Sequence, residues 1–186
     1  MADQGAEGLL SPFLRRRRIN MASLYLKGRI LDVGCGSGEL ARQIKPDNYV
    51  GHDKDAYSIA LAKKNFTAHR FSVSVPSLNE KFDTIVSLAV IEHVAYPVEF
   101  LRSWSIYLKD TKSQFVLTTP HPRIEIIHAI GSRIGLFSKH GNEEHEQLID
   151  HKVFERISQQ AGLKIIKFEK FLMGMNQLFV LKKNDL

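Results

Sequence analysis

The chain has 186 residues, of which 44% are apolar, so it is long enough for one hydrophobic core and too short for two. Its net charge of +6 is compatible with an anionic partner or with none, and charge alone does not choose between them. A single cysteine excludes an intramolecular disulfide and a cysteine metal site.

The N-terminal segment, residues 1–27, is expected to be an extension with one short helix before the first strand. It lacks the apolar centre of a signal peptide, and no run reaches the roughly 20 apolar residues of a spanning helix, so we expect a cytoplasmic protein. Arg15 to Arg18 would point in several directions on a helix, which suits a solvated face as well as an anionic partner. Aromatic residues that would stack on bases are missing around them, so nucleic acid is not favoured.

A glycine-rich turn follows the first predicted strand, residues 30–33. The glycines stand at alternate positions, Gly34, Gly36 and Gly38, and a helix is expected to begin at Glu39. Glycine permits positive φ and lets backbone amides approach a ligand closely. An ordinary turn without a ligand is the alternative. A dinucleotide fingerprint would need its third glycine at Glu39, which disfavours a nicotinamide-dependent oxidoreductase.

The second predicted strand, residues 49–53, ends in Asp53, 21 residues after Asp32. A carboxylate there is suited to accept hydrogen bonds from both hydroxyls of a ribose that lies over the glycine turn. Asp53 or Asp55 would also suit the N-terminus of a helix over residues 56–65. We expect Asp55 to cap this helix and Asp53 to bind.

Residues 82–94 contain a near-continuous apolar run that leads to Glu92 and His93. The run predicts a central parallel strand with this pair just beyond it. An amphipathic helix over residues 97–108 and a strand over 114–119 follow, and the strand ends before Pro120-His121-Pro122. Two later strands, residues 163–171 and 176–182, are joined by four residues, which allows only a hairpin. The pattern predicts a single α/β domain, doubly wound, with a mostly parallel sheet and one antiparallel strand near an edge.

The acid before G-x-G-x-G, the acid after the second strand and the Glu92-His93 pair together resemble the class I S-adenosylmethionine-dependent methyltransferases, over roughly residues 28–119. Within them the pattern is similar to the branch of ubiquinone-type O-methyltransferases. The resemblance implies a seven-stranded Rossmann-like fold with S-adenosylmethionine as cofactor. The cofactor-binding residues that it implies are Asp32, Gly34, Cys35, Gly36, Gly38, Asp53, Lys54, Ser74 and Leu88.

Two positions depart from this branch. Ser74 or Val75 stands where the family usually has an acid for the adenine amino group, and Lys54 stands where an apolar residue commonly packs. The aliphatic stem of Lys54 would then cover the adenine face.

The expected reaction is methyl transfer to an oxygen or nitrogen of a small molecule, or of a lipid- or glycan-linked group. Residues 88–91 lack the Asn/Asp-Pro-Pro-aromatic pattern of enzymes that methylate exocyclic amines, and Cys35 lies in the cofactor turn rather than near an acceptor. The alternatives are a non-catalytic nucleotide-binding module and an RNA methyltransferase.

A general base is needed only if the acceptor must lose a proton. The candidates follow the strand ends, at His93 and His121, or lie in the segment before the last helix, at His145 or His151. Each is also suited to a cap or a surface position. The acids and histidines of residues 140–151 do not have the spacing of a metal site, and none is expected. Residues 124–150 are a predicted lid, whose apolar part with flanking arginines would contact an anionic membrane or pack on the sheet.

Overall fold

The computed structural model describes residues 11–121 and 149–184, in which strands and helices alternate along most of the chain. The strands are β1 (Ile30–Val33), β2 (Tyr49–His52), β3 (Arg70–Ser72), β4 (Thr84–Leu88), β5 (Gln114–Pro120), β6 (Leu163–Phe171) and β7 (Asn176–Lys183). The helices are α1 (Ser11–Ser23), α2 (Ala56–Asn65), α3 (Pro97–Ser105) and α5 (His151–Gln160). Short 3-10 helices are η2 (Glu39–Gln43), η3 (Pro46–Asn48) and η4 (Ile91–His93).

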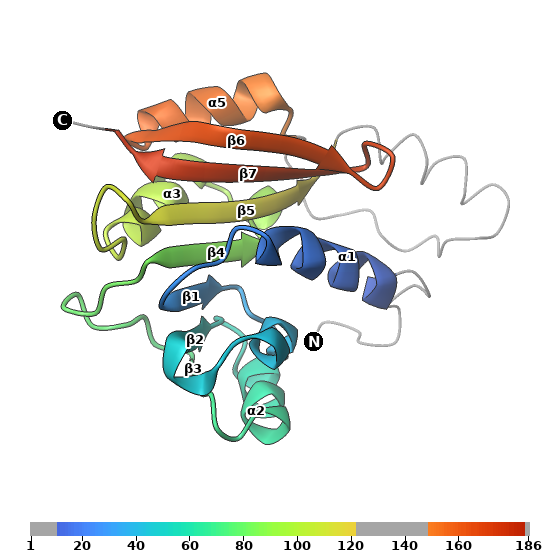
Figure 1. The fold of residues 1–186 in the computed structure, drawn as a ribbon, viewed down its shortest axis with the longest axis vertical. Coiled ribbons are helices and arrows are strands. Elements are labelled where there is room, and N and C mark those ends of the chain that lie inside the picture. The colour runs from blue at the N-terminus through green and yellow to red at the C-terminus, as the bar shows by residue number, and fades with distance from the viewer. Residues whose placement is uncertain (1–10, 122–148, 185–186) are drawn as a thin grey trace, which may run out of the picture.

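The strands form one seven-stranded sheet in the order β3-β2-β1-β4-β5-β7-β6 (Figure 1). Neighbouring strands from β3 to β5 run parallel, and β7 runs antiparallel to both β5 and β6. The predicted class, a doubly wound sheet with one antiparallel strand near the edge, is confirmed. In such a sheet, ligands bind beyond the carboxyl ends of the strands, where the strand order reverses between β1 and β4.

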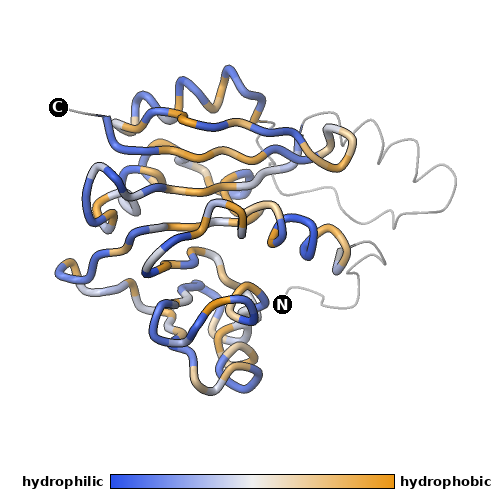
Figure 2. The backbone as a smooth tube through the Cα atoms, viewed as in Figure 1, coloured by the Kyte–Doolittle hydropathy of each residue, from blue (hydrophilic) through white to orange (hydrophobic). Residues whose placement is uncertain are grey.

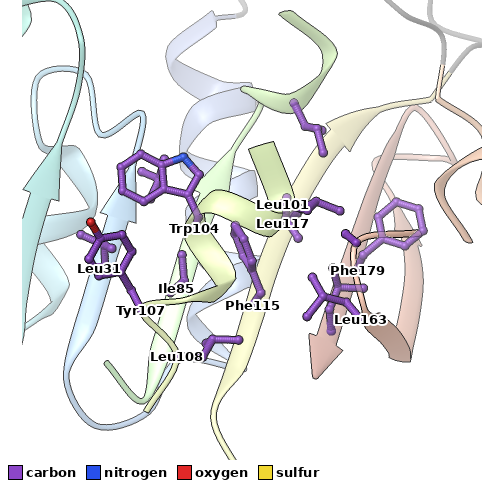
Figure 3. Close-up of a cluster of buried hydrophobic side chains, with 14 of the residues drawn as sticks. Leu31, Ile85, Leu101, Trp104, Tyr107, Leu108, Phe115, Leu117, Leu163 and Phe179 are labelled. Carbon is purple, nitrogen blue, oxygen red and sulfur yellow. The ribbon is translucent and has the colours of Figure 1, made fainter. Parts of the chain in front are cut away.

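The central strands are mostly apolar because both faces of the sheet are covered. One cluster lies between the sheet and helices α3 and α5, and Figure 3 shows Leu101 and Trp104 of α3 among its members, with Ile85 and Phe115 of the sheet. The other cluster lies on the side of α1 and α2. In Figure 2 the hydrophobic colour accordingly runs along the central strands, while the outer helices alternate.

Two helices are shorter than predicted. The helix after the glycine turn is the five-residue η2, because the chain must return to β2 within a few residues and Pro46 interrupts the return. Helix α3 ends at Ser105 rather than at Leu108. Of the predicted lid, residues 124–148 lie outside the described residues, whereas Ile149 is buried and Asp150 caps α5 by accepting from the Val153 amide. In the part described, no helix is long and apolar enough to cross a membrane.

Candidate functional site

The glycine turn is tied to the end of β2 by backbone hydrogen bonds. The amides of Gly34 and Cys35 both donate to the carbonyl of His52, at 2.8 and 3.1 Å. The three glycines adopt positive φ angles, 77° at Gly34, 50° at Gly36 and 83° at Gly38. The turn therefore requires left-handed backbone at every second position, as the alternation predicted.

The glycines differ in what a side chain would meet. A Cβ atom on Gly34 would lie 2.4 Å from Val90, and one on Gly38 would lie 2.8 Å from the Phe71 ring. A Cβ atom on Gly36 would have nothing within 4 Å. Gly34 and Gly38 thus serve packing within the protein, while Gly36 borders open space. This arrangement fits a cofactor that lies directly over the backbone of Gly36.

Asp53 is held beside the turn by two backbone amides. Its Oδ2 accepts from the Gly36 amide at 2.8 Å, and its Oδ1 accepts from the Asp55 amide at 2.9 Å. Each carboxylate oxygen retains acceptor capacity, so the fixed carboxylate suits a pair of ribose hydroxyls. Asp55 caps α2 by accepting from the amides of Tyr57 and Ser58, and the predicted capping role is confirmed.

Replacing Asp53 with alanine is expected to weaken cofactor binding by about 1.5–3 kcal/mol, because charge-assisted hydrogen bonds are lost. The matched control is Asp55→Ala, which should lower stability through the lost helix cap and leave cofactor affinity unchanged. Calorimetric titration with S-adenosylhomocysteine and a thermal melt measure both quantities. An Asp53→Ala protein with wild-type affinity would exclude the ribose assignment.

Asp32, the acid before the glycine turn, is buried within the protein. The side chain is 3% exposed and accepts a 2.7 Å hydrogen bond from the Tyr49 hydroxyl. Burial is the main cause that raises the pKa of Asp32 to about 7, and the hydrogen bond from Tyr49 opposes it. Burial also raises the pKa of the Cys35 thiol, with the Asp32 and Asp53 carboxyls adding to the effect. Cys35 therefore remains a thiol at neutral pH and is unsuited to act as a nucleophile.

The raised pKa of Asp32 predicts a pH-dependent stability. The folded state holds this proton up to about pH 7, whereas an unfolded chain releases it near pH 4. Stability from this group is complete below about pH 4 and declines up to pH 7, by at most about 1.4 kcal/mol per pH unit. Asp32→Asn should flatten this decline in denaturant titrations, while Asn in place of the exposed Asp47 should not. Identical pH slopes for wild type and Asp32→Asn would refute the assignment.

The remaining predicted cofactor residues follow other strand ends. Lys54 and Ser74 are exposed, beyond β2 and β3, and the Ser74 amide donates to the Ser72 hydroxyl at 2.9 Å. Leu88 is half-buried at the end of β4. Since β2, β3 and β4 are parallel, all three residues lie toward the same edge of the sheet as the glycine turn.

In the described part of the chain, the histidines predicted as candidate bases do not lie together in one site. His93 is exposed at the end of η4. The Nε2 atom of His121 lies 3.2 Å from the Lys170 ammonium, which can only donate, so Nε2 is the acceptor of this contact. His145 lies outside the described residues. His151 packs its ring against Phe168, with 4.4 Å between the centroids, and so contributes to the core.

The sequence places Glu92 after the apolar run but does not indicate a role for it. It follows β4, is 2% exposed, and its Oε2 atom has no hydrogen-bond partner. Burial raises the pKa of Glu92, while His93, Arg18 and Thr119 oppose the shift. An acid directly after an apolar central strand was the available signal. A buried carboxyl of this kind is suited to exchange a proton with a bound acceptor.

More unpartnered polar atoms lie near the same edge. Arg18 of α1 donates from Nε to Oδ1 of Asn176 at 2.8 Å, which joins α1 to the start of β7. The Asn176 Nδ2 and Thr118 Oγ1 atoms are buried without a partner. Buried polar groups are usually satisfied by protein, water or ligand. The carboxyl ends of β4 and β5 and the start of β7 thus present donors and acceptors suited to a polar acceptor molecule.

Comparison with known proteins agrees with this geometry. The family profile described as "Methyltransferase domain" matches residues 8–167. The ubiquinone biosynthesis O-methyltransferase of Roseobacter denitrificans is 25% identical over 158 residues, which are 78% of this chain and 64% of that protein. The chain thus spans less than two thirds of the length of this relative.

Solved structures show the same fold. An S-adenosylmethionine-dependent methyltransferase from Clostridium acetobutylicum aligns with a TM-score of 0.66 and 14% identity, over 93% of this chain and 90% of that chain. The magnesium protoporphyrin IX methyltransferase of Synechocystis, solved with bound S-adenosylhomocysteine, aligns with a TM-score of 0.67 and 14% identity, over 97% and 90%.

Proposed function

Because the chain belongs to the class I S-adenosylmethionine-dependent methyltransferases, we propose that it transfers a methyl group from this cofactor to an oxygen or nitrogen of a small molecule, or of a lipid- or glycan-linked group. Glu92 carries this proposal. Its buried carboxyl and unpartnered oxygen lie at the strand end where the acceptor of this fold is expected.

The cofactor supplies an activated methyl group on a sulfonium. The protein then needs to hold the acceptor atom in line with the bond that breaks, exclude water and receive a proton where the acceptor is a hydroxyl. In that case the cofactor would supply the methyl group to the acceptor oxygen, and the Glu92 carboxylate would receive the hydroxyl proton. Asp53 and the backbone of Gly36 hold the cofactor. Arg18 and Asn176 border the site of the acceptor.

The chemistry of Glu92 favours a hydroxyl acceptor over an amine that is already deprotonated. A carboxylate with a raised pKa is a stronger base than an ordinary one, and a base is useful only for an acceptor that must lose a proton before or during attack. The name of the ubiquinone biosynthesis relatives is compatible with this choice. Contact with an anionic membrane through residues 124–137 stays a prediction.

Calorimetric titration with S-adenosylmethionine, S-adenosylhomocysteine and NAD tests the cofactor first. We expect saturable binding of the first two and none of NAD. Transfer of a labelled methyl group is then measured on panels of hydroxylated aromatic compounds, amines and lipid extracts, with release of S-adenosylhomocysteine as the readout. Cofactor binding without acceptor-dependent release on any panel would favour a non-catalytic binding module, and binding of NAD alone would refute the proposal.

A further inference from the structure

A cavity of about 570 Å³ lies between helix α1 and the short helix η2. Helix α1 lies across the sheet, in contact with β4 and β5 (Figure 1). The described residues that line the cavity come from these two helices and include none of the glycines of the turn. We call it the α1–η2 cavity. Its volume is within the range of small-molecule binding sites, roughly 300–1,000 Å³.

Packing and polar contacts fix the two walls relative to each other. Ile19 and Ala22 of α1 belong to the same buried cluster as Leu40 and Ala41 of η2. Gln43 joins the helices again, because its Oε1 accepts from the Ser23 hydroxyl at 2.6 Å and its Nε2 donates to Asn20 at 3.4 Å. The cavity is therefore bounded by elements that are held together on two sides.

The lining of the cavity is strongly basic. Arg15 and Arg16 line one wall and Arg42 of η2 lines the other, while Glu39 is the one acid among the lining residues described. The contact between Arg42 and Glu39 is 3.5 Å long and exposed, so it offsets little of this charge. An anion between the two walls would be attracted by guanidinium groups from both.

The four consecutive arginines do not act as one surface. Arg18 reaches Asn176 at the sheet edge, Arg17 is exposed and does not line the cavity, and Arg15 and Arg16 face η2. A nucleic acid backbone is bound by a stripe of cations, often with aromatic residues between them. Cations gathered around a concave site instead suit one compact anionic group.

We propose that the α1–η2 cavity binds a small molecule that carries a phosphate group. The guanidinium groups of Arg16 and Arg42 hold the phosphate from opposite walls, and the apolar side chains of Pro12 and Ile19 contact the remainder of the molecule. A planar guanidinium pairs with two phosphate oxygens at once, which favours phosphate over a singly bound anion. Gly36 does not line the cavity, and binding there does not depend on methyl transfer.

Phenyl phosphate is the probe, with inorganic phosphate and phenol as comparison ligands, and binding is followed by calorimetry at fixed ionic strength. We expect phenyl phosphate to bind more tightly than inorganic phosphate and phenol not to bind. Arg16→Gln and Arg42→Gln should each weaken phenyl phosphate binding roughly tenfold, the effect of one lost charge-assisted pair. Arg17→Gln removes the same charge from the same helix and should leave affinity within about twofold.

Four outcomes would overturn the proposal. Equal losses of phenyl phosphate affinity in Arg16→Gln and Arg17→Gln would show a general charge effect. If Arg16→Gln and Arg42→Gln also reduced co-sedimentation with phosphatidylglycerol vesicles in parallel, the arginines would be assigned to a lipid surface. Displacement of phenyl phosphate by S-adenosylhomocysteine would make the cavity part of the cofactor site. Absence of saturable binding in the wild-type protein would leave the cavity without a phosphate ligand. Arg42→Gln lies outside α1, so it tests the site even if an α1 variant unfolds.

Discussion

Gly36→Val is expected to abolish cofactor binding while the protein still folds. The backbone at Gly36 has φ of 50°, and space around a side chain there is open within 4 Å. A valine would put its branched side chain into the space that the cofactor needs, which should reduce affinity on the order of 100-fold or more. The backbone strain itself costs about 1–3 kcal/mol of stability. Calorimetry with S-adenosylhomocysteine and a denaturant titration separate the two effects.

Gly174→Val is the matched control. Gly174 also has positive φ, 83°, and also has nothing within 4 Å of a Cβ atom, but it lies in the β6–β7 hairpin. The same substitution there should lower stability and leave cofactor affinity unchanged. Gly38→Ala should also lower stability, because its Cβ atom would lie 2.8 Å from the Phe71 ring. If Gly36→Val binds cofactor like the wild type, the glycine turn has only a structural role.

Glu92→Gln is expected to lower kcat about 100-fold for a hydroxyl acceptor, the typical cost of a lost general base, with little change in cofactor affinity. Because the pKa of Glu92 is raised, we expect kcat of the wild type to fall on acidification at a pH that is still above the usual pKa range of a carboxyl group. Loss of this acid limb in Glu92→Gln identifies proton transfer, because a merely structural effect would scale kcat at every pH. A buried carboxyl with a raised pKa destabilises the folded protein as the pH rises and the group ionises. Glu92→Gln should therefore be at least as stable as the wild type at pH 8.

His121→Ala and His145→Ala test the histidines predicted from the sequence. A histidine base would lose about 100-fold in kcat on replacement. Because Nε2 of His121 already accepts from Lys170, we expect His121→Ala to lose much less than Glu92→Gln. A larger loss of kcat in His121→Ala than in Glu92→Gln would identify His121 as the general base. Full turnover in all three variants across the pH range would mean that positioning alone drives the transfer, or that the acceptor is an amine that is already deprotonated.

The sequence by itself determined the strand pattern, the antiparallel hairpin and the glycine turn, because these depend on local chemistry. Apolar runs, alternate glycines and a four-residue connection specify strands, positive φ and a hairpin without knowledge of distant residues. Asp55 was assignable as a helix cap for the same reason, since a cap contacts amides two and three residues ahead. Asp53 was placed at the turn through the strand ends that precede it.

Only the tertiary structure decided what each polar group faces. Burial and contacts between distant segments set the roles of Asp32 with Tyr49, of Glu92 at the edge of the sheet and of Gly36 against Gly34 and Gly38. The arginine cluster divides in the same way, because packing of α1 against η2 and β7 sends neighbouring side chains to different places. Sequence spacing gives the face of a helix, but the partner of that face comes from segments far along the chain, and that partner decides the chemistry.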